Sequence, residues 1–283
     1  MTLPSEPEYE VFALKYGARS DRTRGDSYLL DPNPHLPDAI EYFIWVIRNE
    51  DRLFVVDTGF DAEAAKRLNR KPFDDPATVL KQFGIIASDV DTVLITHMHF
   101  DHVGSLPPFS KAKFHLQEAD LAYATGPGMK YEFLRRPYER GTVSQMVDHL
   151  HAGRAILHDG DWQLAPGITL HRVDGHARGQ QAIRINTRRG HVVLASDAAA
   201  FVEHFLDYKL SPILVDAEAM LMAYDRLYEL ADSEDHIITG HDPLTSVIYP
   251  RVPAINAEVF KLHEKPVATI RAALKAARSG GPR

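Results

Sequence analysis

The sequence contains no cysteine, which excludes disulfide bonds, thiolate metal ligands and a cysteine nucleophile. It also has no run of about 18 apolar residues, the length that a membrane-spanning helix requires. Residues Met1 to Glu10 lack the basic start and apolar run of a signal peptide. The expected location is therefore the cytoplasm, with no membrane partner.

The chain also lacks an excess of basic side chains. The chain of 283 residues has 32 basic and 39 acidic side chains, and its formal net charge is -7. Nucleic-acid binding requires a basic face, so nucleic acid is not an expected partner. Hydrophobic residues make up 45% and charged residues 25%, a composition typical of a globular protein with a sizeable core. We expect one domain over residues 1–283.

Extended segments come in two groups along the chain, each followed by helical segments. Strands are predicted at 9–16, 27–30, 42–48, 53–57, 93–96, 113–116, 168–173, 181–186, 191–195 and 236–239. Helices are predicted at 61–68, 76–83 and 217–231, the last with Asp216 as N-cap, and in a tail from about residue 254. Turns at 49–51 and 188–190 predict hairpins, which favour a two-layer sheet core over a doubly wound parallel sheet.

A dense group of metal-ligand side chains follows the apolar strand predicted at 93–96. His97 and His99 are two residues apart, so in an extended chain they point to the same side. Asp101 and His102 come next, and Gly104 permits a tight turn. The helical zincin pattern, with histidines four residues apart, is absent. This density of ligands predicts a metal site better than it fits a polar loop.

The segment Thr96-His-Met-His-Phe-Asp-His102 resembles the signature of the metallo-β-lactamase-fold hydrolases. Further matches occur in the order typical of that family: Asp57-Thr58-Gly59, Asp174-Gly175-His176, Asp197 at a strand end, and Thr239-Gly240-His241. The resemblance implies a mixed α/β fold, a four-layer αββα sandwich with two sheets face to face. The site would lie at one edge, where the loops at the strand ends meet.

The resemblance also implies a ligand set for two divalent metal ions. One metal would be held by His97, His99 and His176, the other by Asp101, His102 and His241, and Asp197 would bridge them. Asp57 would either orient a ligand histidine or form a turn. Imidazole and carboxylate ligands suit Zn, Mn, Fe or Co, and we expect zinc. Oxygen-reducing di-iron relatives carry glutamate where this chain has His99, so the histidine favours hydrolysis.

Within that superfamily, the chain is most similar to the zinc-dependent lactonases of the acyl-homoserine lactonase type. The similarity rests on chain length, on residues 16–31, on His176 to Gln181, and on a mostly helical insertion at about 117–153 expected beside the active site. The implied reaction opens a lactone by attack of a metal-bridging hydroxide. Asp101 would be the catalytic residue that moves the proton.

The sequence departs from that group at one position. Those lactonases commonly carry a tyrosine three residues after the bridging aspartate, where this chain has Ala200. A different lactone, ring-fused or acidic, is therefore an open alternative. Replacement donors would be Tyr131, Tyr138 or Tyr208, which could equally be packing aromatics. Side chains that could meet a substrate carboxylate, or simply face solvent, are Arg135, Arg136, Arg178 and Lys209.

Two other functions share this ligand set. A thioester hydrolase of the glyoxalase II kind would use all the same metal ligands, although this chain has no clear thiol-binding pattern at its C-terminus. A non-catalytic metal-binding or sensor protein is a second alternative, which the complete ligand set disfavours. The expected partner is a small-molecule lactone or ester. The insertion could line the substrate pocket, cover the core or form the face of a homodimer.

Overall fold

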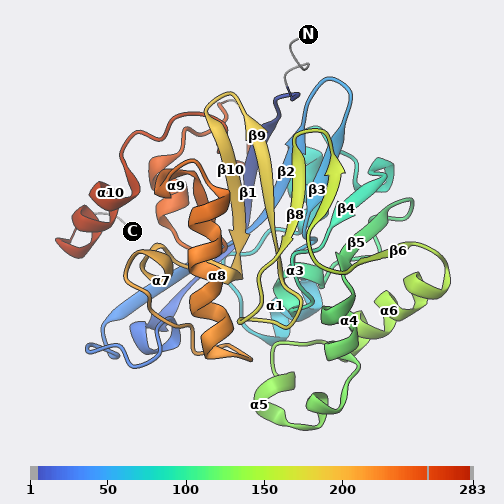
Figure 1. The fold of residues 1–283 in the computed structure, drawn as a ribbon, viewed down its shortest axis with the longest axis horizontal. Coiled ribbons are helices and arrows are strands. Elements are labelled where there is room, and N and C mark those ends of the chain that lie inside the picture. The colour runs from blue at the N-terminus through green and yellow to red at the C-terminus, as the bar shows by residue number, and fades with distance from the viewer. Residues whose placement is uncertain (1–5, 254, 281–283) are drawn as a thin grey trace.

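The computed structural model describes residues 6–253 and 255–280, which form two β-sheets packed face to face (Figure 1). The strand order is β12-β1-β2-β3-β4-β5-β6 in one sheet and β11-β10-β9-β8-β7 in the other. The first sheet consists of β1 (Glu10–Thr23), β2 (Pro37–Arg48), β3 (Leu53–Val56), β4 (Thr92–Leu94), β5 (Lys113–Gln117), β6 (Ala155–His158) and β12 (Glu258–Lys261). The second consists of β7 (Trp162–Ala165), β8 (Ile168–Arg172), β9 (Gln181–Thr187), β10 (Gly190–Ser196) and β11 (Ile237–Thr239).

Helices flank the two sheets and complete the predicted αββα sandwich. The α-helices are α1 (Ala62–Arg67), α2 (Pro76–Gln82), α3 (Phe100–Val103), α4 (Glu118–Ala124), α5 (Glu132–Arg135), α6 (Arg140–His151), α7 (Val202–Leu206), α8 (Ala217–Leu230), α9 (Leu244–Ile248) and α10 (Ile270–Arg278). Short 3-10 turns are η1 (Arg24–Asp26), η2 (Ala87–Asp89), η3 (Pro127–Lys130), η4 (Asp197–Ala199) and η5 (Glu234–His236). Among the described residues, no helix combines the length and apolar character needed to cross a membrane.

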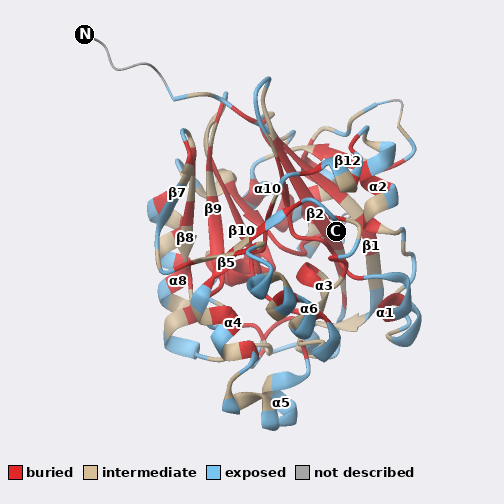
Figure 2. Cartoon of the chain, turned by 90° about the vertical axis from the view of Figure 1, so that its right-hand side faces the viewer, coloured by how far each residue is buried: buried red, intermediate tan, exposed pale blue. Residues whose placement is uncertain are grey.

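Two hydrophobic clusters hold these layers together. Between the sheets, Trp45 and Leu94 of the first pack in one cluster with Leu170 and Val193 of the second, all fully buried. A second cluster joins the other face of the first sheet to its covering helices, and contains Leu80 of α2 and Met146 of α6 with strand residues such as Ile44 and Val55. Figure 2 shows this arrangement, with buried strands inside and helices whose outer faces are exposed. Removal of these apolar faces from water is the main force that stacks the layers.

Most predicted elements form where the sequence places them. The hairpin of β2 and β3 pairs Arg48 with Leu53, and the β9–β10 hairpin pairs Thr187 with Gly190. Helix α8 begins directly after Asp216, whose side chain accepts a hydrogen bond of 3.0 Å from the backbone N–H of Ala219. The predicted N-cap is therefore confirmed.

Three local predictions were wrong or incomplete. Residues 27–30 form turns after η1 rather than a strand, and Leu30 has a positive φ of 56°. Residue 254, the expected start of the helical tail, lies outside the described residues; β12 follows it, and α10 begins only at Ile270. Strands β6, β7 and β12 were not predicted, because a strand of four residues depends on its neighbours more than on its own alternation.

The segment at 117–153 is mostly helical, as predicted. It contains α4, η3, α5 and α6, and η3 begins at the break predicted at Gly126-Pro127-Gly128. In Figures 1 and 2, α5 lies at the tip of this segment, away from the sheets.

Candidate metal centre

The seven predicted ligands come together at one edge of the sandwich. In the second sheet β9 runs opposite to its neighbours β8 and β10, and β11 is parallel to β10, so β8, β10 and β11 all end at the same edge. His176 lies in the loop after β8, Asp197 directly follows β10, and His241 lies just beyond β11. From the first sheet, β4 leads into His97 and His99, and α3 carries Asp101 and His102. Four separate chain segments thus supply the cluster.

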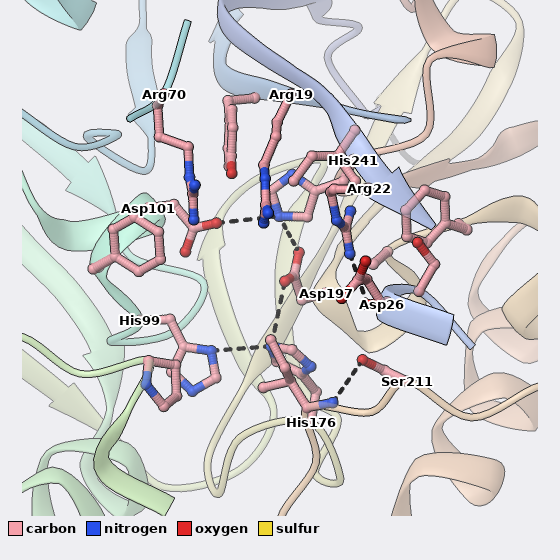
Figure 3. A pocket seen from close by; sticks show the side chains of 18 residues that line it. Arg19, Arg22, Asp26, Arg70, His99, Asp101, His176, Asp197, Ser211 and His241 are labelled. Carbon is pink, nitrogen blue, oxygen red and sulfur yellow. Dashed lines mark hydrogen bonds and ion pairs between the residues drawn. The ribbon is translucent and has the colours of Figure 1, made fainter. Parts of the chain in front are cut away.

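The side chains form two groups with Asp197 between them, and Figure 3 shows Asp197 between His176 of one group and His241 of the other. Ligand atoms of His97, His99 and His176 lie within 4.8 Å of one another, and those of Asp101, His102 and His241 do the same. One oxygen of Asp197, Oδ2, is 3.3 Å from His176 Nε2. The other, Oδ1, is 3.1 Å from His241 Nε2 and 3.5 Å from His102 Nε2. The grouping is the one that the family resemblance implies.

Several polar atoms of the cluster are buried without a hydrogen-bond partner. They include the Nε2 atoms of His97 and His102 and Oδ1 of Asp197. Between His99 and His176, ring nitrogens Nδ1 and Nε2 face each other at 3.0 Å. Because buried polar atoms are almost always paired, a set of convergent lone pairs of this kind fits shared metal cations.

The protonation of the cluster also suits metal binding. Burial lowers the pKa values of His97, His99 and His176, which keeps these imidazoles neutral and able to ligate. Burial acts the same way on His102 and His241, but the charges of Asp197 and Asp101 together with the hydrogen bond to Asp197 outweigh it and raise both pKa values.

Contacts behind the ligands fix the orientation of two rings. Asp57 Oδ2 accepts a hydrogen bond of 2.7 Å from His102 Nδ1, and Asp57 Oδ1 accepts one of 2.7 Å from the backbone N–H of Thr96. The backbone oxygen of Glu41 lies 2.9 Å from His241 Nδ1. With Nδ1 donating in both rings, Nε2 is directed into the cluster. The roles of Glu41 and Thr96 were not predicted: no motif marks Glu41, and Thr96 belongs to the signature segment without offering a ligand.

Two glycines permit close approaches at the site. A Cβ on Gly240 would overlap Asp197 Oδ1, and a Cβ on Gly104 would overlap the backbone oxygen of Phe100. The backbone of Gly104 is right-handed, with φ -74°. Its role is therefore close packing against its neighbours rather than the unusual turn expected from the sequence.

A pocket opens directly onto the cluster. Its lining includes His99, Asp101, His176, Asp197 and His241, together with Arg19, Arg22, Arg70, Tyr42, Ala200 and Phe201. Ala200, which stands where the similar lactonases carry tyrosine, is thus part of the pocket wall. The three arginines were not singled out from the sequence, since nothing in their local pattern distinguishes them from surface charges.

The side chains suggested as substrate contacts do not line this pocket. Tyr131 is 55% exposed, Tyr208 donates a hydrogen bond of 2.5 Å to Asp225, and Arg178 stacks on Tyr123. None of these three lines the pocket. Tyr138 packs its ring 4.7 Å from that of His99. Of the remaining basic candidates, Lys209 pairs with Glu203, and Arg135 and Arg136 donate to the backbone oxygens of Lys130 and Pro212.

The αββα sandwich and the His/Asp cluster at its edge are the features of a metallo-hydrolase. Residues 40–244 match the metallo-beta-lactamase superfamily, and the chain belongs to this superfamily. It is 24% identical over 213 residues to an N-acyl homoserine lactonase of Bacillus cereus, covering 70% of this chain and 80% of that protein.

Solved structures show the same fold. One is an N-acyl homoserine lactone hydrolase with the product N-hexanoyl-L-homoserine bound at the catalytic metal center; its TM-score is 0.72 at 22% identity, covering 87% of this chain and 98% of that one. Another is AidC, a dizinc quorum-quenching lactonase, with a TM-score of 0.65 at 16% identity, covering 89% and 95%.

Proposed function

We propose that this protein hydrolyses a lactone with two divalent metal ions, zinc by preference. The main support is the cluster itself, in which seven ligand side chains converge at the floor of a pocket and five of them carry unpartnered buried atoms. The similarity to lactonases, one of them dizinc, favours both the substrate class and the metal. When bound, such cations lower the pKa of water and polarise a carbonyl.

The proposal assigns separate roles to the residues of the cluster. His97, His99 and His176 would hold one cation, Asp101, His102 and His241 the other, with Asp197 shared. Asp57 would keep the His102 ring oriented. These assignments follow the geometry of the two groups.

Asp101 is the proposed catalytic residue. Its side chain is 13% exposed and lines the pocket, so it reaches the space that a substrate occupies. The Tyr16 hydroxyl donates a hydrogen bond of 2.8 Å to the backbone oxygen of Asp101 and holds it in place. Asp101 takes a proton from the attacking water, whose oxygen bonds to the lactone carbonyl carbon. As the ring C–O bond breaks, the leaving oxygen takes that proton from Asp101, which yields a hydroxy acid and regenerates the carboxylate.

Metal analysis followed by a substrate panel tests the proposal. The purified protein should bind two zinc ions per chain and open lactones faster than thioesters or β-lactams. His97→Ala and Asp101→Asn should each lower kcat/KM by about a thousandfold or more, the scale of a lost metal or proton-transfer group. His35→Ala, which removes an exposed histidine outside the cluster, is the matched control.

Other outcomes would replace the proposal. Turnover of thioesters alone would favour the glyoxalase II kind of enzyme. Protein that binds two metals but hydrolyses no ester, thioester or lactam would instead be a metal-binding or sensor protein.

A further inference from the structure

Three arginines line the pocket, and the proposed reaction gives none of them a role. Arg19 and Arg22 belong to β1, and Arg70 follows α1. In Figure 3 the side chains of Arg70 and Arg19 extend toward Asp101 and His241, and the guanidinium of Arg22 ends beside Asp26. Positive charge is thus concentrated on a single wall, next to the cluster.

A bulge in β1 places two of these arginines on the same face. Residues three apart in a regular strand point to opposite faces. Here Arg19 pairs with Ile40 and Arg22 with Asp38, so a step of three residues along β1 matches a step of two residues along β2. Because of the extra residue, the side chains of Arg19 and Arg22 lie on the same face of the strand, and both line the pocket. Bulges commonly serve to redirect a side chain near an active site.

Part of the guanidinium hydrogen-bonding capacity is unused. Arg22 Nη1 and Arg70 Nε are buried without a hydrogen-bond partner, although Arg22 Nη2 donates to the backbone oxygen of Asp26 and Arg70 Nη1 to that of Leu68. Buried donors attached to a charged group are costly to leave unpaired. A ligand with acceptor oxygens would satisfy them.

The metal ligands do not explain this charge. Two divalent cations would balance the carboxylates of Asp57, Asp101 and Asp197 and one bound hydroxide, so the arginines are not needed to neutralise the metal ligands. Carboxylates of the chain offset part of the arginine charge. Asp21 pairs with Arg19 Nε at 2.7 Å. Burial lowers the pKa of Arg22, and the charges of Asp38 and Asp26 oppose that shift. Asp26 itself accepts hydrogen bonds from the backbone and hydroxyl of Thr23.

We propose that the substrate is a lactone bearing a free carboxylate, which binds to this arginine wall, where Arg22 and Arg70 have unpaired donors. Guanidinium groups bind carboxylates in a planar, charge-assisted geometry. Such an anchor would orient the ring over the cluster without the tyrosine that Ala200 replaces. This inference rests on the proposed lactone hydrolysis and narrows its substrate class.

Matched lactones test the inference. The zinc-loaded protein is assayed with butyrolactones that carry a carboxylate on the β or γ ring carbon, each against the carboxamide at the same carbon. We expect at least one carboxylate to exceed its carboxamide in kcat/KM by about tenfold or more, as expected for one charge-assisted contact. Unsubstituted butyrolactone and N-hexanoyl homoserine lactone complete the panel.

Charge-removing variants then locate the anchor. Arg22→Gln and Arg70→Gln should each reduce the carboxylate-to-carboxamide ratio by about tenfold. Lys66→Gln, which removes an equal charge from an exposed position on α1, should leave the ratio as in the wild type. Thermal melting verifies that each variant is folded.

A binding measurement gives a readout apart from turnover. Calorimetry with glutarate on chelator-treated protein should show affinity reduced by about tenfold in each arginine variant and retained in Lys66→Gln. Equal kcat/KM for every carboxylate and its carboxamide, or ratios and glutarate affinities unchanged by both arginine substitutions, would overturn the inference while lactone hydrolysis stands. Failure to open any lactone of the panel would instead overturn the proposed function.

Discussion

Asp57 combines an unusual backbone with contacts to two other segments. Its φ is 61°, it is fully buried, and it accepts hydrogen bonds from His102 and from Thr96. Asparagine and aspartate tolerate this left-handed conformation better than most residues. A residue that is strained and fully hydrogen-bonded behind a ligand points to orientation of that ligand.

Asp57→Asn should weaken zinc affinity by about 10–100-fold, because the substitution keeps the backbone conformation but removes the charge that holds the His102 ring. Competition with a chromophoric chelator measures the affinity. Asp51→Asn, at an exposed position in the turn between β2 and β3, is the control. Affinities that agree within twofold across all three proteins would rule out this role.

Gly240 is also important to the metal centre, because a residue without a Cβ leaves space for the side chain of Asp197. Gly240→Ala should displace that carboxylate, release metal and destabilise the fold by about 1–3 kcal/mol, the usual effect of overpacking. Chemical denaturation and metal analysis measure both effects. Gly141→Ala in α6 should be neutral or stabilising, since nothing lies within 4 Å of a Cβ there. A metal content equal to that of the wild type would contradict the prediction.

At the scale of elements, the direction of the strands assembles the cluster. Strands β8, β10 and β11 end at one edge, and each end is followed by a predicted ligand. The ligand motifs were readable from the sequence because each follows an apolar strand. The three short strands were not, since they form only when a neighbouring strand supplies hydrogen bonds.

Helix α8 offers a test at this scale. Its N-cap Asp216 accepts the backbone hydrogen bond of Ala219. Asp216→Ala should lower the free energy of unfolding by about 1 kcal/mol, the usual effect of losing such a cap. Denaturant titration measures it. Glu218→Ala, in the same first turn, removes an equal charge without the cap; an equal loss in both variants would mean that charge rather than capping is responsible.

At the scale of the whole molecule, a buried ion-pair network joins distant parts of the chain. Glu203 of α7 lies within 3.0 Å of Arg24, Lys209 and Arg278, and Arg24 also pairs with Asp31 at 2.7 Å. Ser27, three residues after Arg24, lines the pocket, so the network supports one wall of the site. Lys209, which the sequence suggested as a possible substrate contact, is a member of this network.

The network predicts a pH dependence of stability. The Arg24 hydrogen bond lowers the pKa of Asp31 to about 2. A lowered pKa in the folded state stabilises the fold fully above the unfolded value of about 4, and this contribution is lost as the pH falls toward 2. Asp31→Asn should therefore destabilise by about 2 kcal/mol at pH 7, and the difference from wild type should shrink below pH 4.

Denaturant titrations of metal-free protein at pH 7, 5 and 3 measure that difference. Asp89→Asn removes one member of an exposed pair with Lys111 and should change stability by about 0.5 kcal/mol or less. A gap between wild type and Asp31→Asn that stays constant down to pH 3 would show that the lost contact is not electrostatic.

The sequence by itself determined the layered fold class, most strands, and the seven side chains that meet at the edge. Most strands follow from local periodicity, and the metal site after residues 93–96 follows from its density of ligand side chains. The αββα fold and the ligands His176, Asp197 and His241 follow from the resemblance to the metallo-β-lactamase-fold hydrolases. The tertiary structure decided what surrounds them. Asp57 and His102 are 45 residues apart, and Glu41 and His241 are 200 apart. Only folding brings such pairs together, because their contact depends on sheet order and register. The same holds for Arg19, Arg22 and Arg70, which look like ordinary surface charges until a bulge and a loop place them on one wall.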